Sequence, residues 1–327
     1  MNSNGEKTLI IGAAGFVGVH LMTCLSAEGR NVSATKLSQE TIDSDIAVYD
    51  LDILDADAVR TLFEDVNPGC VFHLAAQSSV ALSWKEPALT VDINIKGAVH
   101  VLEAARAMKH PARVLLIGSS EEYGAVRPEQ LPVDEETPLR PGNIYAATKA
   151  AQDMLGAVYA NAYGMDVLMI RAFNHIGPGQ SPMFAVSDFC RQVARIESGL
   201  QEPIIRVGNL SAKRDFTDVR DVVRAYSLLS QRGEGGTAYN VGSGCSVSIQ
   251  SILDIILAQA KADIRVERDE TRFRPADVPV VEADTKRLRE TTGWRPEIPV
   301  SETIADALAW WRMYCRDDRI GIDGRDI

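Results

Sequence analysis

Short apolar runs alternate with longer segments of helical period through the first half of the chain. The strand-like runs cover residues 8–11, 32–35, 71–74, 114–117, 166–171 and 238–241. Segments in which apolar residues recur every three or four positions cover residues 16–28, 59–66, 93–108 and 145–162. Alternating strands and helices are typical of an α/β protein with a Rossmann-type, doubly wound parallel sheet.

The pattern becomes less regular after residue 171. A Gly/Pro-rich loop, IGPGQSP, is followed by helical segments near residues 187–198 and 301–314. We therefore expect residues 1–171 to form a dinucleotide-binding Rossmann domain, and residues 172–327 to form mainly a smaller C-terminal α/β substrate lobe. The segment near 214–244 still has the apolar pattern of sheet-packing material, so we expect the chain to return to the first domain there.

Composition narrows the class of protein. The 327 residues are 46% hydrophobic and 24% charged, which is ordinary for a globular domain, and no apolar run approaches the ~18 residues of a membrane span. With a polar N-terminus, MNSNGEK, the expected location is the cytoplasm, away from membranes. A net charge of -11 argues against nucleic acid as a partner. The five cysteines and five histidines show no metal-ligand spacing, so no metal site is expected.

A glycine-rich turn follows the first predicted strand and opens the first predicted helix. Its sequence, GAAGFVG, comprises Gly12, Gly15, Phe16, Val17 and Gly18 among its residues. Glycines let a backbone turn tightly and approach a pyrophosphate, whose charge is favoured at a helix N-terminus. The order strand, glycine loop, helix therefore predicts a dinucleotide site.

The end of the second predicted strand bears on which dinucleotide is bound. An NAD site usually has an acidic residue there for the ribose 2′-hydroxyl, but this stretch reads SATKL, with no acid before Glu40. Thr35 or Lys36 would accept a 2′-phosphate. We therefore favour NADP(H), with NAD(H) as the alternative; Lys36 is equally well explained as a solvated lysine at a strand end.

Tyr145 and Lys149 stand four residues apart in a predicted helix, so both side chains emerge on one face. A phenol is a poor acid near neutral pH until a neighbouring cation lowers its pKa. The pair is thus a candidate for acid/base chemistry beside the predicted dinucleotide. Ser119, after another predicted strand, is a candidate third member, although a serine is also common at strand ends.

Together with the glycine loop, the segments HLAAQS (73–78), GSSEEYG (118–124) and YAATK (145–149) resemble the extended short-chain dehydrogenase/reductases along essentially the whole chain. The resemblance implies that Ser119 holds the reacting oxygen, Tyr145 is the acid/base, and Lys149 binds ribose and tunes the tyrosine. It also implies further cofactor contacts and a homodimer built on the helices near 93–108 and 145–162. Those cofactor contacts are Asp52, Ile53, Leu74, Ala75, Ala76 and Asn94.

Four later segments, RAFNHIGPGQ, GNLSAKRDFTDVRD, RFRPADVP and TTGWRP, resemble the GDP-mannose 4,6-dehydratases and GDP-4-keto-6-deoxy-mannose reductases. The resemblance implies a GDP-sugar cleft between the lobes. Arginines suit a diphosphate and a carboxylate suits a ribose diol, although each arginine alone is as well explained by a surface ion pair. The implied cleft residues are Ser119, Ser120, Glu121, Asn174, Arg214, Arg274 and Asp277.

The choice between reduction and dehydration rests on few residues. A dehydratase needs a further carboxylate, and Ser119-Ser120-Glu121 resembles the Thr-Ser-Glu run of dehydratases, so Glu121 would be catalytic in that case. FNHIGPGQ is closer to the reductases, and Asp188 stands where a dehydratase lysine is expected. We therefore predict NADPH-dependent reduction of the C4 ketone of GDP-4-keto-6-deoxy-D-mannose to GDP-D-rhamnose or its C4 epimer. A dehydratase, possibly bifunctional, is the alternative, and a non-catalytic NADP-binding regulator is a remote one.

Overall fold

The computed structural model describes residues 7–272 and 278–316. Its largest feature is a sheet of seven parallel strands in the order β10-β6-β5-β4-β1-β2-β3. The strands are β1 (Lys7–Ile11), β2 (Asn31–Lys36), β3 (Ala47–Asp50), β4 (Cys70–His73), β5 (Arg113–Ile117), β6 (Val167–Ala172) and β10 (Ala238–Val241). The predicted Rossmann-type α/β fold is thereby confirmed, with β3 as a strand that the apolar pattern did not predict.

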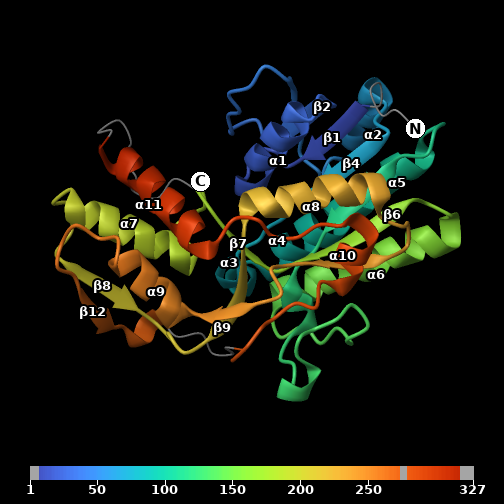
Figure 1. The fold of residues 1–327 in the computed structure, drawn as a ribbon. Coiled ribbons are helices and arrows are strands. Elements are labelled where there is room, and N and C mark those ends of the chain that lie inside the picture. The colour runs from blue at the N-terminus through green and yellow to red at the C-terminus, as the bar shows by residue number, and fades with distance from the viewer. Residues whose placement is uncertain (1–6, 273–277, 317–327) are drawn as a thin grey trace.

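Helices cover both faces of this sheet (Figure 1). One face packs against α1 (Phe16–Ala27), α8 (Val219–Arg232) and α10 (Lys286–Thr292). The other packs against α2 (Ala56–Val66), α5 (Ala98–Ala107) and α6 (Ile144–Tyr163). Alternate residues of each strand enter the two apolar cores, as in β1, where Ile10 packs on the first face and Leu9 on the second. Near-continuous apolar strands such as β1 are therefore buried on both sides.

A smaller lobe has its own sheets and core. Strands β7 (Asn174–Ile176), β9 (Lys213–Asp218) and β11 (Ser246–Ser248) form one sheet, and β8 (Ile204–Val207) pairs with β12 (Arg265–Arg268). Helices α7 (Ala185–Glu197), α9 (Ile249–Leu257) and α11 (Val300–Arg316) enclose a separate apolar core around Trp311. Between β9 and β11 the chain passes back through α8 and β10 to the large sheet (Figure 1).

The segment expected as one helix over 93–108 is a longer, interrupted helical run. It begins with α3 (Val80–Lys85) and α4 (Pro87–Val91), passes through a π-helical turn at Asp92–Gly97, and continues as α5. A π-turn widens the helix locally and is frequent at functional sites. Here it places the buried Asn94 beneath the end of β4. Within the described residues, no helix is long and apolar enough to cross a membrane.

Candidate active site

The glycine turn after β1 is shaped by close backbone contacts. Gly12 has a φ of +83°, and a Cβ there would lie 2.7 Å from the backbone of Ala75. Gly18 packs directly on the backbone of Ala13, again leaving no room for a side chain. Gly15 is different, because a Cβ there would meet only the Gly12 carbonyl oxygen, at 3.6 Å. Gly12 and Gly18 therefore close the turn, and Gly15 leaves its outer surface clear.

Helix α1 begins at this clear surface. Its N-cap is Gly15, no side chain caps its first N–H groups, and its first turn contains no acidic residue. Uncapped N–H groups and the helix dipole together favour an anion. The turn and helix therefore fit a pyrophosphate, as the sequence predicts. Phe16 and Val17 are half-buried against the first core, with the Phe16 ring stacked on His175 at 5.9 Å between centroids.

The structure gives Thr35 and Lys36 different roles from the expected one. Thr35 is buried, and its hydroxyl accepts a hydrogen bond from the Gly12 N–H at 3.1 Å, so it holds the glycine turn and is not exposed to a phosphate. The Lys36 ammonium pairs with Asp50 of β3 at 2.5 Å, because parallel pairing of β2 with β3 places these residues side by side. An acid therefore does face this end of β2, from the neighbouring strand.

The other expected cofactor residues surround the same end of the sheet. Asp52 is exposed, and its carboxylate accepts the Leu54 N–H at 2.9 Å. The Ile53 side chain is instead buried against Gly97, so only its backbone is left to meet a ligand. Leu74, Ala75 and Ala76 follow β4 and are half-buried, and the N–H groups of the first two bond the Ile11 carbonyl. These residues lie where a dinucleotide would cross the sheet.

Asn94 was expected to contact the cofactor, but its amide is used inside the protein. Its Oδ1 accepts the Gln77 N–H at 2.8 Å, and its Nδ2 donates to the Gln77 carbonyl at 3.0 Å and the Thr148 hydroxyl at 2.9 Å. The side chain is fully buried. Asn94 thus ties the loop after β4 to helix α6, which is a positioning role.

Helix α6 carries the predicted pair. Its N-cap Asn143 accepts the Ala146 N–H at 2.8 Å through its side chain, which fixes where the helix begins and places Tyr145 in its first turn. Lys149, one turn later, is buried and donates to the Ile117 carbonyl at 2.7 Å and to Gln152 Oε1 at 3.1 Å. The Ser119 side chain lies near enough to the Tyr145 phenol to influence its pKa. The three predicted catalytic residues therefore lie close together, where β5 ends and α6 begins.

Burial dominates the electrostatics of this group. It raises the pKa of the Tyr145 phenol above its usual value, and the nearby Ser119 side chain opposes that rise. Burial also lowers the pKa of Lys149 to about 8, against the attraction of Glu122. We expected Lys149 to lower the pKa of Tyr145. Its ammonium donates to Ile117 and Gln152 instead, so it does not counter the rise in the pKa of Tyr145.

The loop after β5 presents the remaining candidates. Ser119 Oγ accepts the Glu121 N–H at 3.2 Å and begins the 3-10 turn Ser120–Tyr123. Glu121 is half-buried, and its Oε2 accepts a hydrogen bond from Asn143 Nδ2 at 3.0 Å. The structure places it against the start of α6, near Tyr145.

Two of the four expected substrate residues of the smaller lobe can be placed. Asn174 opens β7 and is exposed, and Arg214 lies on the adjacent strand β9. Arg214 donates to the carbonyls of Lys213 at 2.8 Å and Val278 at 2.6 Å. Arg274 and Asp277 lie outside the described residues.

Three further residues of this site escaped the sequence reading: Asn143, Gln152 and Glu122. Asn143 occupies an N-cap, for which Asn directly before a helix is a recognisable signal. Gln152 stands one turn beyond Lys149, at a spacing that places the two side chains together. Glu122 is fully buried beneath the Ser119 loop, and nothing in the sequence distinguishes it from its neighbour Glu121.

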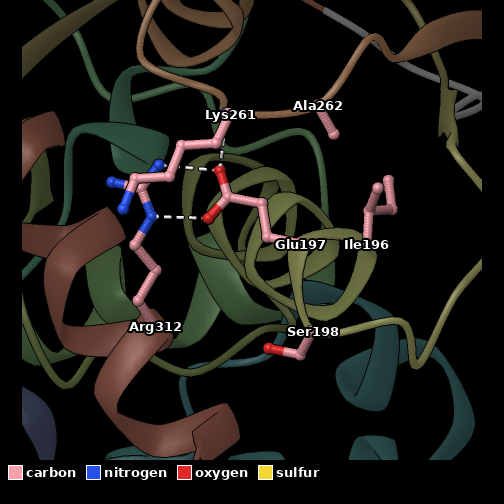
Figure 2. A pocket seen from close by; sticks show the side chains of 6 residues that line it. All are labelled: Ile196, Glu197, Ser198, Lys261, Ala262 and Arg312. Carbon is pink, nitrogen blue, oxygen red and sulfur yellow. Dashed lines mark hydrogen bonds and ion pairs between the residues drawn. The ribbon is translucent and has the colours of Figure 1, made fainter.

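Figure 2 shows a separate surface pocket of about 220 Å³ on the smaller lobe. Arg312 of α11 grips Glu197 of α7 through two hydrogen bonds of 2.7 Å, and the Lys261 N–H donates to the same carboxylate at 2.9 Å. Both carboxylate oxygens are therefore occupied within the protein. These contacts join α7 to α11, and none of the residues predicted for cofactor or substrate lines the pocket. Within the described parts of the chain, no group of three or more metal-type ligands comes together.

Comparison with known proteins shows similarity to enzymes of sugar-nucleotide metabolism. The chain is 34% identical to GDP-6-deoxy-D-mannose reductase of Pseudomonas aeruginosa, over 96% of the chain and 99% of the relative. It is 33% identical to GDP-mannose 4,6 dehydratase 2 of Arabidopsis thaliana, over 77% of the chain and 68% of the relative.

Solved structures extend the likeness to the fold. The structure of RMD from Pseudomonas aeruginosa complexed with NADPH matches with a TM-score of 0.84 at 33% identity, covering 94% of this chain and 99% of that one. The UDP-glucose 4-epimerase of Thermus thermophilus in complex with NAD matches with a TM-score of 0.85 at 28% identity, with the same coverage. The family model described as GDP-mannose 4,6 dehydratase matches residues 9–307. Given that span, the chain belongs to the GDP-mannose 4,6 dehydratase family within the extended short-chain dehydrogenase/reductases.

Proposed function

We propose that this protein is an NADPH-dependent reductase of the C4 ketone of GDP-4-keto-6-deoxy-D-mannose. The observation that carries the proposal is the end-to-end match with a GDP-6-deoxy-D-mannose reductase, both in sequence and in the structure of a relative that binds NADPH. The site supports it, because an anion-binding glycine turn and the Ser119, Tyr145 and Lys149 group lie at the same edge of one sheet.

The side chains of the site divide the reaction between them. When bound, the nicotinamide supplies a hydride to C4. Ser119 donates a hydrogen bond to the ketone oxygen, on which negative charge develops. Tyr145 gives its phenolic proton to that oxygen, and its raised pKa keeps it protonated beforehand. Lys149, the one cation of helix α6, is held one turn away by Ile117 and Gln152 and is the group available to balance the negative charge that this leaves on Tyr145. The product is GDP-D-rhamnose or its C4 epimer, according to the face that receives the hydride.

Asn174 and Arg214 are the proposed substrate contacts of the smaller lobe, and Arg274 and Asp277 keep the same assignment from the sequence. Arg214 sits with its guanidinium against the Val278 carbonyl, directly after residues 273–277. A guanidinium suits a diphosphate through paired N–H groups. Arg214→Met should raise the KM for the sugar nucleotide and leave NADPH affinity unchanged.

Dehydration of GDP-mannose is the second candidate, and Glu121 favours it. Asn143 holds the carboxylate beside Tyr145, where a dehydratase needs a further acid/base group. Two incubations separate the candidates. Loss of NADPH absorbance only with GDP-4-keto-6-deoxymannose supports the reductase. Formation of a 4-keto sugar from GDP-mannose without added reductant would make the chain a dehydratase and Glu121 its base.

We also propose a homodimer in the cytoplasm. Helix α6 exposes Met154 and Val158, four residues apart on one face, at 55% and 54% exposure. In α5, the other helix expected at such an interface, Leu102 is fully buried in the protomer's own core. Sedimentation at micromolar concentration tests the proposal: Val158→Glu should dissociate a dimer, whereas a wild-type monomer would refute it.

A further inference from the structure

Glu122 lies beneath the catalytic loop and is completely buried. Its Oε1 accepts a hydrogen bond of 2.6 Å from the Ser119 N–H. The same oxygen packs so closely on Gly118 that a side chain there would collide with it. Glu122 thus fixes the backbone on either side of the serine that holds the reacting oxygen.

The second oxygen of Glu122 is the unusual feature. Oε2 is buried and accepts no hydrogen bond from any described residue. The Arg171 Nε lies 3.9 Å from it, but Arg171 commits its fork to Asp153 through bonds of 2.9 and 3.0 Å. An ionised carboxylate with one oxygen left without a donor is costly in a protein interior, whereas a protonated one carries no charge to solvate.

The charges around Glu122 oppose one another. Lys149 and Arg171 favour its ionised form, and Asp153 disfavours it. Burial and the Asp153 carboxylate raise the pKa of Glu122 to about 8. In turn, ionised Glu122 raises the pKa of the Lys149 ammonium and of the Tyr145 phenol. The titratable groups that face it are Tyr145, Lys149 and Asp153 of α6, Arg171 of β6, and Tyr123 of its own turn.

We propose that Glu122 is a positioning residue that holds Ser119 in place while its own carboxyl group is protonated. When the carboxyl loses that proton to solvent in alkaline solution, it favours the charged form of the Lys149 ammonium. The proposal rests on the proposed reductase function. Solvent reaches the partners of Glu122 from a hollow of about 440 Å³ that Asp153 and Arg171 line. Deprotonated Glu122 thereby extends the pH range over which Lys149 stays charged and Tyr145 stays a phenol.

Glu122→Gln tests the proposal, because the amide oxygen keeps the bond from the Ser119 N–H and cannot ionise. The kcat/KM of the variant and of wild type is measured from neutral to alkaline pH, and the shapes of the two profiles are compared. In alkali the activity of the variant should fall at a pH about one unit lower than the activity of wild type does. At a given alkaline pH the variant should then be roughly tenfold less active. A purely structural role would lower activity equally at every pH. Glu129→Gln, on an exposed turn, is the control and should leave the profile unchanged.

Two further results decide the matter. Glu122→Ala, which removes the bond to Ser119, should lower kcat at all pH values while NADPH affinity persists. Infrared titration of wild type minus Glu122→Gln should show the C=O stretch of a protonated carboxyl at neutral pH, lost in alkali. Superimposable pH profiles, or no such band, would overturn the proposal. A wild-type protein inactive on the keto sugar would instead refute the reductase function, and the infrared titration, which needs no turnover, would still test Glu122.

Discussion

The Lys149 ammonium donates a 2.7 Å hydrogen bond to the carbonyl oxygen of Ile117, the last residue of β5. The bond joins helix α6 to the end of strand β5, which leads into the loop that carries Ser119. The ammonium is therefore positioned by the sheet itself, and a change in the register of α6 would displace Lys149 and Tyr145 together.

Tyr145→Phe should remove the proton donor and little else, because the ring stays and only the hydroxyl is lost. We expect kcat to fall by roughly 10²–10⁴-fold, the usual contribution of a general acid. NADPH affinity, measured by fluorescence titration, should change by less than about twofold, since a general acid contributes to the transition state. Tyr163→Phe, at the exposed end of the same helix, serves as the control. Normal turnover in Tyr145→Phe would exclude the phenol from the mechanism.

Asp50 should weaken the preference of the site for NADPH. Its carboxylate pairs with Lys36 and so draws that cation away from the 2′-phosphate expected there, and it is itself 61% exposed. In Asp50→Asn the lysine is released and a repulsive charge is lost, so the ratio of NADH to NADPH Kd should rise by roughly three- to tenfold. Lys36→Met should lower that ratio. Equal ratios in both variants and wild type would show that this strand end does not contact the cofactor.

Gly12→Ala should damage both stability and cofactor binding. The left-handed backbone at Gly12 and the nearby backbone of Ala75 each disfavour a Cβ. A loss of about 2 kcal/mol or more in the free energy of unfolding is expected, measured by urea titration. Gly142→Ala is the matched control, because a Cβ there meets nothing within 4 Å and its φ is not positive. A Gly12→Ala protein as stable as that control would contradict the assigned geometry.

His73, at the end of β4, should destabilise the protein in acid. It is fully buried, neither ring nitrogen has a hydrogen-bond partner among the described residues, and burial lowers its pKa from 6.5 to about 3. The unfolded chain therefore takes up a proton that the folded chain refuses. The stabilisation is present above pH 6.5 and is lost as the pH falls toward 3, by about 1.4 kcal/mol per pH unit.

His73→Leu isolates this contribution. The variant should be as stable as wild type at neutral pH, because it removes a polar group without partners, and its advantage should grow as the pH is lowered. His110→Leu, at an exposed position, controls for loss of a histidine at the surface. If wild type and His73→Leu lose stability in parallel, the His73 ring is protonated in the folded state.

Local signals explain what the sequence predicted well. The turn from β1 into α1 is encoded within neighbouring residues, and Tyr145 and Lys149 share a helix face whatever the rest of the chain does. Strand β3 was missed because its apolar run, residues 46–49, is short, and the strand is mostly exposed. The short strands β8, β11 and β12 depend on pairing partners far away in sequence.

The misplaced roles are tertiary in origin. Thr35 and Asn94 were expected to face the cofactor, but each bonds a segment that sequence proximity does not reveal, Gly12 and Thr148 respectively. The sequence showed no acid close to Lys36, because Asp50 belongs to a different strand. Only the pairing of β2 with β3 brings the two residues side by side. The burial of Glu122 requires the loop, β6 and α6 to be assembled around it. Partners of this kind become visible only in the folded chain.

The return of the chain through α8 and β10 also governs the order in which the protein can be completed during synthesis. Six strands of the large sheet emerge by Ala172, but the seventh, β10, follows only after β7, α7, β8 and β9. Until then β6 presents an unpaired edge, and the face that α8 covers stays open. A nascent chain therefore exposes an incomplete sheet with an unpaired edge while part of the smaller lobe is translated. Because the chain crosses between the lobes more than once, cleavage at one peptide bond cannot separate them.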